Sequence, residues 1–184
     1  MSFTNEKLNP KSCIEKQYKD FIEDSCGEEG CYLNLVNVPD CVILKGEKVS
    51  VEIKGHGQKE KSGDNILFVF KNKKLVYLAV TEYTHRKDHG LDTTIKKLNT
   101  CVKSAFRVME TCKLKCTRVE FFPIVLAGRF TTKISRRTGR RKNAKDIKRE
   151  SEIAKITFGP KAYPIYFKTC GTRFMDIVKD ANIL

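Results

Sequence analysis

The chain has 184 residues, 40% of them hydrophobic, which is enough to bury the core of one compact domain. Its 36 Lys and Arg residues outnumber 22 Asp and Glu residues, giving a formal net charge of +14, so we expect an anionic partner, nucleic acid before an acidic membrane surface. No run approaches the roughly 18 apolar residues of a membrane span. Because the N-terminus has no apolar signal-peptide core, we expect a cytoplasmic protein without a membrane partner.

Eight cysteines need an explanation in a chain expected in the cytoplasm. Thiols stay reduced there, so we expect free cysteines instead of disulfides. Two close pairs, Cys26 with Cys31 and Cys112 with Cys116, could together offer four thiolates to one zinc ion, but their spacing is looser than that of a zinc knuckle. Unligated thiols are therefore the prediction, and structural zinc is not expected.

The first element is predicted to be a helix over residues 10–25. Asn9 can cap it and Pro10 suits its first position, and apolar residues then recur at helical spacing. Residues 1–9 are expected to form a flexible N-terminus.

Residues 31–55 are rich in Val, Ile and Leu and are predicted to form two or three strands. Turn signals lie at Pro39–Asp40 and at residues 45–48. A polar, glycine-rich loop, GHGQKEKSG, follows over residues 55–63.

A β-hairpin is predicted over residues 64–84, where the apolar runs DNILFVF and LVYLAVTEYT are separated by lysines and an asparagine. Side chains alternate between the two faces of a strand, and both Asp64 and Glu82 fall on the more apolar face of their strands. A three-residue loop at Asn72–Lys74 pairs even-numbered residues with even-numbered ones, and this register sets Asp64 opposite Glu82.

From Asp92 onward the hydrophobic period becomes that of an amphipathic helix, with Asp92 placed as its cap. The apolar residues of its predicted buried face are Ile95, Leu98, Val102, Ala105, Phe106 and Met109.

The run VEFFPIVLAG (119–128) is almost continuously apolar, as in a strand covered on both faces, and we expect it beside the hairpin. A short helix near 144–156, a last strand within 162–171 and a helix around 173–178 complete the prediction. Antiparallel strands that continue through a helical crossover indicate an α/β fold, a mixed central β-sheet flanked by helices, in a single domain over residues 1–184.

In this order of elements and acids, the chain resembles the PD-(D/E)XK, or restriction-endonuclease-like, superfamily over residues 10–130. The resemblance implies a restriction-endonuclease-like core (αβββαβ), followed here by a basic C-terminal extension. In that family an acid begins the second core strand, which is the position of Asp64. The third strand ends in Glu-x-Lys or Asp-x-Lys just before a helix, but here Val80 takes the position of the acid and Glu82 that of the lysine.

The resemblance also implies roles for these positions. Two carboxylates, here Asp64 and Glu82, would hold Mg²⁺ or Mn²⁺ against the scissile phosphate, while a lysine orients the attacking water. Because the strand lacks that lysine, Lys96 or Lys97 on the following helix is expected to replace it, and we assign the role to Lys96.

A second placement of the motif uses Pro39-Asp40 and then Glu52-Ile53-Lys54. A turn at 45–48 would bring Asp40 near the end of the strand that holds Glu52. The residue types match the family motif more closely here than in the first placement. However, Lys54 leads into the glycine-rich loop, whereas in the family a helix follows the motif. This alternative set, Asp40, Glu52 and Lys54, stays open beside the first, as does the absence of a metal site.

Residues 129–149 form a basic loop or helix segment, with ten Lys or Arg and one acid, and they contribute nine of the fourteen surplus charges. Cations that neutralise phosphates release counterions, so binding through this segment should weaken steeply with salt. Gly139 lies among arginines, which favours a loop that follows a duplex backbone instead of reading bases. The residues assigned to nucleic-acid binding are Arg129, Lys133, Arg136, Arg137, Arg140, Arg141, Lys142 and Lys145.

We therefore predict a Mg²⁺- or Mn²⁺-dependent nuclease that hydrolyses phosphodiester bonds, with DNA preferred over RNA. One alternative keeps the fold and the binding but drops catalysis, so that the protein is a DNA- or RNA-binding or assembly subunit. Another is a basic RNA- or ribosome-associated protein whose sheet is only a scaffold. The sequence also allows a homodimer.

Overall fold

The computed structural model describes most of the chain, in six stretches. They are residues 9–28, 30–54, 62–84, 91–115, 118–128 and 154–181, with the side chains of 51–54 left out. Among the helices in these stretches, none is long and apolar enough to cross a membrane.

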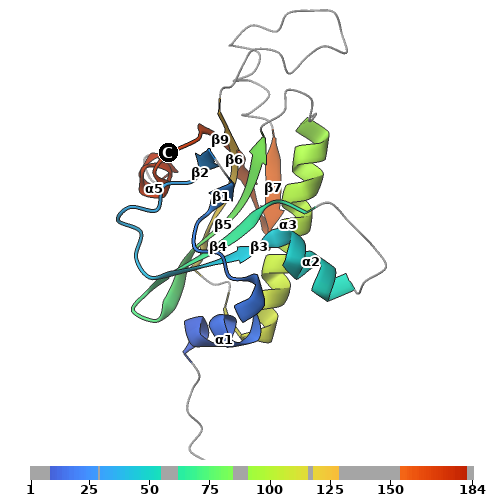
Figure 1. The fold of residues 1–184 in the computed structure, drawn as a ribbon, viewed down its shortest axis with the longest axis vertical. Helices are drawn as coiled ribbons and strands as arrows, with labels where there is room; N and C mark the ends of the chain where they lie inside the picture. Colours follow the sequence, from blue (N-terminus) through green and yellow to red (C-terminus); the bar gives the residue numbers. More distant parts are fainter. Residues whose placement is uncertain are drawn as a thin grey trace, which may run out of the picture.

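A five-stranded sheet forms the centre of the molecule, with helices on both faces (Figure 1). In spatial order its strands are β3 (Cys41–Lys45), β4 (Asn65–Lys71), β5 (Lys74–Thr84), β6 (Glu120–Ala127) and β9 (Tyr166–Thr169). The first three pair antiparallel, and β5, β6 and β9 pair parallel. The prediction of an α/β fold with a mixed central sheet flanked by helices is confirmed.

The parallel pairing of β5 with β6 depends on the long helix α3 (Leu91–Thr111). Two parallel strands start at the same edge of the sheet, so the chain must cross back from the end of β5 to that edge before β6 begins. α3 is the predicted amphipathic helix, although it begins at Leu91, so Asp92 lies in its first turn instead of capping it. β6 lies beside the hairpin and is buried on both faces, as predicted for residues 119–128.

The first face of the sheet is covered by α3 together with α1 (Pro10–Gln17), α2 (Gly46–Lys54) and the strand pair β7 (Lys155–Phe158) and β8 (Lys161–Pro164) (Figure 1). Even-numbered residues of β4 point into this core, as do Leu78 and Val80 of β5.

The second face is covered by α5 (Phe174–Ala181) and by the short ribbon β1 (Gly27–Glu28) and β2 (Cys31–Tyr32) (Figure 1). The sheet is therefore buried on both sides, which explains why β4 and β6 are apolar almost throughout.

The hairpin turn differs from the prediction while the register agrees with it. The turn has two residues, Asn72 and Lys73, both in the left-handed region with φ of 51° and 62°, instead of the three-residue loop predicted at Asn72–Lys74. A bulge beside Val69 adds one residue to β5, which compensates for the shorter loop. The ladder then pairs Asn65 with Thr81, so that Asp64 follows opposite Glu82.

Two elements of the first half are corrected. α1 ends at Gln17, and only a short 3₁₀ turn (Lys19–Phe21) follows, so the helix predicted over 10–25 is too long; the Asn9 cap is confirmed, since its side chain accepts a hydrogen bond from the Lys11 N–H. The strand and turn predicted within 45–54 are wrong, because Gly46–Lys54 is helical.

The reason for α2 is tertiary packing. Alternating Val, Ser, Val, Glu and Ile favour a strand locally, but Val49 is fully buried in the core, and the Ser50 hydroxyl lies 2.8 Å from that of Ser104 on α3. Burial against α3 outweighs local preference.

The C-terminal elements are mostly as predicted. The strand expected within 162–171 divides into β8 and β9, and the helix expected around 173–178 is α5. The helix predicted near 144–156 is contradicted at its end, where β7 begins, and its earlier part lies outside the described residues.

Two disulfides overturn the expectation of free thiols for four cysteines. Cys13 pairs with Cys112, joining α1 to the end of α3, and Cys31 pairs with Cys170, joining β2 to the residue after β9. The chain separations of 99 and 139 residues explain why local spacing did not reveal them. Such bridges are typical of oxidising compartments, so they count against the reducing cytoplasm from which free thiols were expected.

Candidate active site

The segment just before β4 is held in place by three neighbouring elements. The Gly63 N–H donates to the Lys97 carbonyl on α3 at 3.0 Å, and the Asp64 N–H donates to Thr81 on β5 at 2.9 Å. The Asp64 carbonyl accepts a hydrogen bond of 2.8 Å from the Gly46 N–H at the start of α2. Asp64 is thus fixed where β4, β5, α2 and α3 meet.

Two glycines make this close approach feasible. A Cβ on Gly46 would lie 2.7 Å from the Cys101 sulfur, and one on Gly63 would lie 2.9 Å from the Thr81 carbonyl oxygen. Carbon atoms do not tolerate these separations, so a side chain at either position would push the start of β4 away from α3.

Glu82 and Lys97 form an ion pair inside the protein. Glu82 is fully buried near the carboxyl end of β5, and its Oε1 accepts a hydrogen bond from Lys97 Nζ, whose side chain is 15% exposed. The other oxygen, Oε2, is buried without a hydrogen-bond partner among the described residues. Such an orphaned acceptor is costly unless a proton, a cation or a substrate satisfies it.

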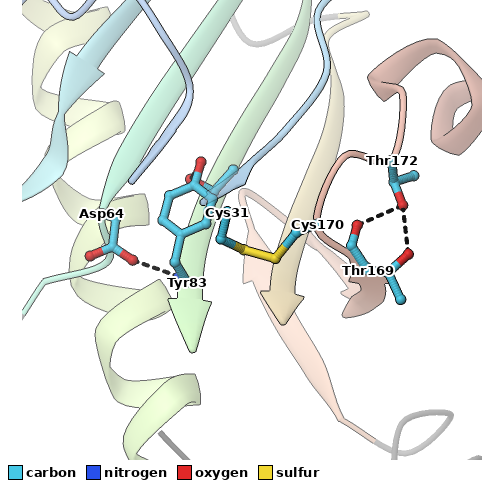
Figure 2. Close-up of a disulfide and its surroundings, with 7 residues drawn as sticks. Cys31, Asp64, Tyr83, Thr169, Cys170 and Thr172 are labelled. Carbon is cyan, nitrogen blue, oxygen red and sulfur yellow. Dashed lines mark hydrogen bonds between the residues drawn. A yellow bond between two sulfur atoms is a disulfide. The ribbon is translucent and has the colours of Figure 1, made fainter. Parts of the chain in front are cut away.

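Asp64 lies next to this pair and is bound to the same strand. Its Oδ2 accepts a hydrogen bond of 2.6 Å from the Tyr83 N–H (Figure 2). The predicted meeting of Asp64 with Glu82 is therefore present in the structure, with a lysine beside them.

Burial controls the protonation of the two acids. It raises the pKa of Glu82, and the negative charge of Asp64 raises it further, while Lys97 opposes both effects. Burial also raises the pKa of Asp64 against the opposing Tyr83 N–H and Lys97, and the charges of Glu28 and Glu47 add to the rise. Two neighbouring carboxyls in this situation titrate as a coupled pair and hold one proton between them readily.

Lys97 remains charged in this environment. Burial alone would lower its pKa, but the hydrogen bond and charge of Glu82, together with Asp64, raise it. With both acids ionised, the three groups therefore carry one surplus negative charge in a protein that is strongly positive overall.

The arrangement fits a hard divalent cation. Mg²⁺ is usually held by one or two carboxylates, with water and substrate phosphate completing its coordination. Asp64 and Glu82 supply two carboxylates, and Glu82 Oε2 is an acceptor that lacks a donor. Within the described stretches, no group of three or more His, Cys, Asp or Glu residues gathers around one point, so the protein itself would supply only part of the coordination.

A polar cluster on the second face of the sheet anchors Tyr83. The Tyr83 hydroxyl donates to the Cys26 sulfur at 3.3 Å and accepts from the Thr81 hydroxyl at 3.2 Å. Figure 2 shows the Tyr83 ring beside the Cys31–Cys170 disulfide. Burial raises the pKa of Cys26 to about 11, so its thiol stays neutral. Tyr83, whose N–H holds Asp64, was missed by the motif comparison; its place directly after Glu82 was the available signal.

The two lysines considered for the site, Lys96 and Lys97, differ in their position relative to the carboxylates. Lys97 contacts Glu82, whereas Lys96 is exposed and is not brought to the carboxylates. The side chain assigned from the sequence was therefore off by one residue, which on a helix is a rotation of about 100°.

The alternative set is not assembled. Asp40 is 61% exposed and forms an ion pair with Lys11 at 2.6 Å. Glu52 and Lys54 belong to helix α2, and no strand brings them back to Asp40. The strand on which this placement depended does not exist.

The basic segment 129–149 lies outside the described residues, but the point where it leaves the fold is described. Ala127 at the end of β6 pairs with Thr84, two residues beyond Glu82. The chain therefore enters this segment from the same end of the sheet as the buried acids. The assigned residues Arg129, Lys133, Arg136, Arg137, Arg140, Arg141, Lys142 and Lys145 all belong to it.

Comparisons with known proteins leave the site to be interpreted from its own geometry. Neither the protein-family models, nor the curated proteins, nor the solved structures contain a match to this chain.

Proposed function

We propose that the protein is a metal-dependent nuclease of the restriction-endonuclease-like type, which hydrolyses phosphodiester bonds in DNA. The observation that carries the proposal is the meeting of Asp64, Glu82 and Lys97 at one end of the sheet, with an unsatisfied oxygen on Glu82. Two acids and a lysine are the groups that this chemistry needs.

The order of elements supports the same proposal. Taken in chain order, α1, β3, β4, β5, α3 and β6 give helix, three strands, helix and strand, the order expected of an αβββαβ core, with a 3₁₀ turn and the ribbon β1–β2 inserted between α1 and β3. α2 is an additional helix between the first and second of these strands. The lysine absent from the third strand is replaced in space by Lys97 from the following helix.

Each residue has a definite part in the proposed reaction. Asp64 and Glu82 would hold Mg²⁺ or Mn²⁺, which when bound supplies charge stabilisation at the phosphate. Tyr83 orients Asp64 through its N–H. Lys97 stays protonated beside Glu82 and can donate a hydrogen bond to the attacking water or to a phosphate oxygen.

The substrate follows from the charge of the chain. A net charge of +14, with nine surplus charges in residues 129–149, suits a polyphosphate backbone, and that segment starts from the end of the sheet where Glu82 lies. We propose duplex DNA over RNA. A cytoplasmic location belongs to the same proposal and requires the two disulfides to persist there.

A second candidate, binding without cleavage, is favoured by the burial of Glu82. The carboxyl is fully buried and already paired with Lys97, so a cation must displace part of this arrangement to bind. In a protein that has lost catalysis, the same ion pair would serve only to hold β5 against α3.

Cleavage of plasmid and branched DNA in Mg²⁺ or Mn²⁺ separates the two candidates. The first predicts cleavage by the natural chain, abolished by Asp64→Asn and retained by Asp40→Asn, which removes an exposed acid at the start of another strand. DNA binding without cleavage would favour the second candidate. Equal cleavage by the Asp64→Asn variant would refute the site, and preference for RNA would favour the RNA- or ribosome-associated alternative.

A further inference from the structure

The turn that joins β4 to β5 concentrates positive charge at one point of the surface. Lys71, Lys73 and Lys74 surround Asn72, and all four residues are exposed. None of the three lysines forms an ion pair or a side-chain hydrogen bond with another described residue. Figure 1 shows this turn projecting at the edge of the molecule. We call residues 71–74 the hairpin tip.

The backbone of the hairpin tip is unfavourable for a lysine. A two-residue turn with positive φ at both positions favours Asn followed by Gly. Asn72 fits the first position, but Lys73 occupies the second with a φ of 62°, where a side chain is strained and glycine is not. The hairpin of β7 and β8 has a glycine, Gly159, at its own positive φ of 60°. The chain therefore keeps a charge at position 73 against the local backbone preference.

The charges of the hairpin tip also oppose its formation. Lys71 and Lys74 are direct partners in the ladder, so their side chains lie on one face of the sheet, about 5 Å apart at Cβ, and repel each other. Asp40 is the acid beside them in the sheet, since its carbonyl accepts a hydrogen bond of 2.7 Å from the Phe70 N–H. Its carboxylate already pairs with Lys11 at 2.6 Å. A negative group from outside the described residues would relieve the repulsion.

The position of the hairpin tip indicates what kind of anion this is. β4 runs from Asp64 to Lys71, so seven residues at about 3.3 Å each place the tip about 23 Å from the buried acids. A small phosphate ligand cannot span this distance. An extended polyanion can, and it also suits a chain with a net charge of +14.

We propose that the hairpin tip is a second contact for the backbone of duplex DNA, at which Lys71, Lys73 and Lys74 bind phosphates. This inference rests on the DNA substrate of the proposed function. A distance of about 23 Å corresponds to roughly seven base pairs from the scissile phosphate. Lysine binds a phosphate as a point charge, so the contact positions the duplex without reading its sequence.

A role in solubility alone makes a different prediction. Exposed lysines on strands and turns also keep proteins from associating, and any of them would serve. Lys155 on β7 and Lys161 on β8 provide a matched control, because both are exposed and lie on the other hairpin. Removing this pair changes the net charge by the same amount as removing Lys71 and Lys74.

The test is the fluorescence anisotropy of a labelled DNA duplex titrated with the full chain, in chelator and at salt concentrations from about 0.05 to 0.2 M. The double variant Lys71→Gln/Lys74→Gln should bind roughly tenfold more weakly at low salt. Its slope of log affinity against log salt should fall by about one to two. The double variant Lys155→Gln/Lys161→Gln should stay within about twofold of the natural chain.

A single substitution separates the charge of the hairpin tip from its backbone. Lys73→Gly should raise the melting temperature by a few degrees, because glycine suits the positive φ, and yet weaken DNA binding. A variant that melts higher and binds DNA as tightly as the natural chain would show that Lys73 contacts no phosphate.

The outcomes distinguish this inference from the function on which it rests. Equal losses in the two double variants, or an unchanged salt slope in Lys71→Gln/Lys74→Gln, would overturn the role of the hairpin tip while the proposed function stands. Weaker binding to vesicles of anionic phospholipid, with DNA binding unchanged, would overturn it in favour of a membrane surface. If the natural chain binds no duplex DNA, the proposed substrate is itself wrong and the role of the tip fails with it.

Discussion

Asp40 and Asp64 each stand immediately before a strand, and the two strands are neighbours, yet the acids have opposite surroundings. β3 and β4 run antiparallel, so the acids lie at opposite ends of the sheet. Asp40 is largely exposed and bonded to Lys11 from α1. Asp64 faces the buried Glu82, with Lys97 from α3 completing the group.

This contrast shows that the residues across the sheet, and not the local sequence, determine the burial and the charged neighbours of a carboxylate. At the end where Asp64 lies, β5 carries Glu82 two residues before its end, and the next helix along the chain carries Lys97. At the end where Asp40 lies, the only cation paired with this acid among the described residues is the partly buried Lys11, and water screens its pairing with the largely exposed Asp40. Substitutions at the two ends of the sheet should therefore have different effects.

The largest effect is expected from Lys97. Replacing it by Met should lower the rate of DNA cleavage by roughly 100-fold or more, because it removes the only described cation next to the two acids. Replacing the exposed neighbour Lys96 by Met should change the rate by less than about threefold. Cleavage kinetics at saturating Mg²⁺ measure both. Equal losses in the two variants would show that the helix contributes only general positive charge.

Stability should distinguish the buried ion pair from the exposed one. Lys97→Met leaves Glu82 buried without its partner and should lower the free energy of unfolding by about 1–3 kcal/mol at neutral pH. Lys11→Met breaks the pair with Asp40 and should cost less than about 1 kcal/mol. Urea unfolding of each variant gives both values, and a larger cost for Lys11→Met would reverse the comparison.

The pH dependence of stability should come from the end where Asp64 and Glu82 lie. Both have pKa values raised on folding, so their contribution to the free energy of unfolding is fully present below about pH 4 and is lost as the pH rises through the folded values. Each tenfold difference in an acid's dissociation constant between the folded and unfolded chains corresponds to about 1.4 kcal/mol. The raised pKa of Lys97 matters only above about pH 10.

Urea unfolding in chelator from pH 4 to pH 9 tests this dependence. Glu82→Gln should flatten the fall in stability, because glutamine cannot ionise. Asp40→Asn, at the other end of the sheet, should keep the natural slope. A slope that survives Glu82→Gln would assign the titration to other groups.

The smallest effect is expected on the second face of the sheet. Tyr83→Phe removes the hydrogen bonds to Cys26 and Thr81 and should cost about 1 kcal/mol of stability, but it keeps the N–H that holds Asp64. Cleavage should therefore fall by less than about threefold. A loss as large as that of Lys97→Met would mean that the ring, and not the N–H, positions Asp64.

The pairing of Asp64 with Glu82 could be predicted because strand alternation depends only on parity. The loop was assigned three residues and has two, but the bulge beside Val69 restores the missing residue, so the parity is unchanged. The apolar runs of α3 and β6 could be predicted for a similar reason, since each buries a face that its own period reveals.

The remaining features depend on contacts between distant segments. Helix α2 forms where local preference favours a strand, because Val49 and Ser50 pack against the sheet and α3. The choice of Lys97 over Lys96 depends on the rotation of α3 about its axis, which the motif does not specify. The two disulfides join cysteines that no local spacing relates.

The most direct test of the central claim is the anomalous diffraction of manganese in crystals of the natural chain soaked in Mn²⁺. We expect one peak between the carboxylates of Asp64 and Glu82, about 2.2 Å from their oxygens. A peak at Asp40, or no peak beside Asp64, would contradict the claim.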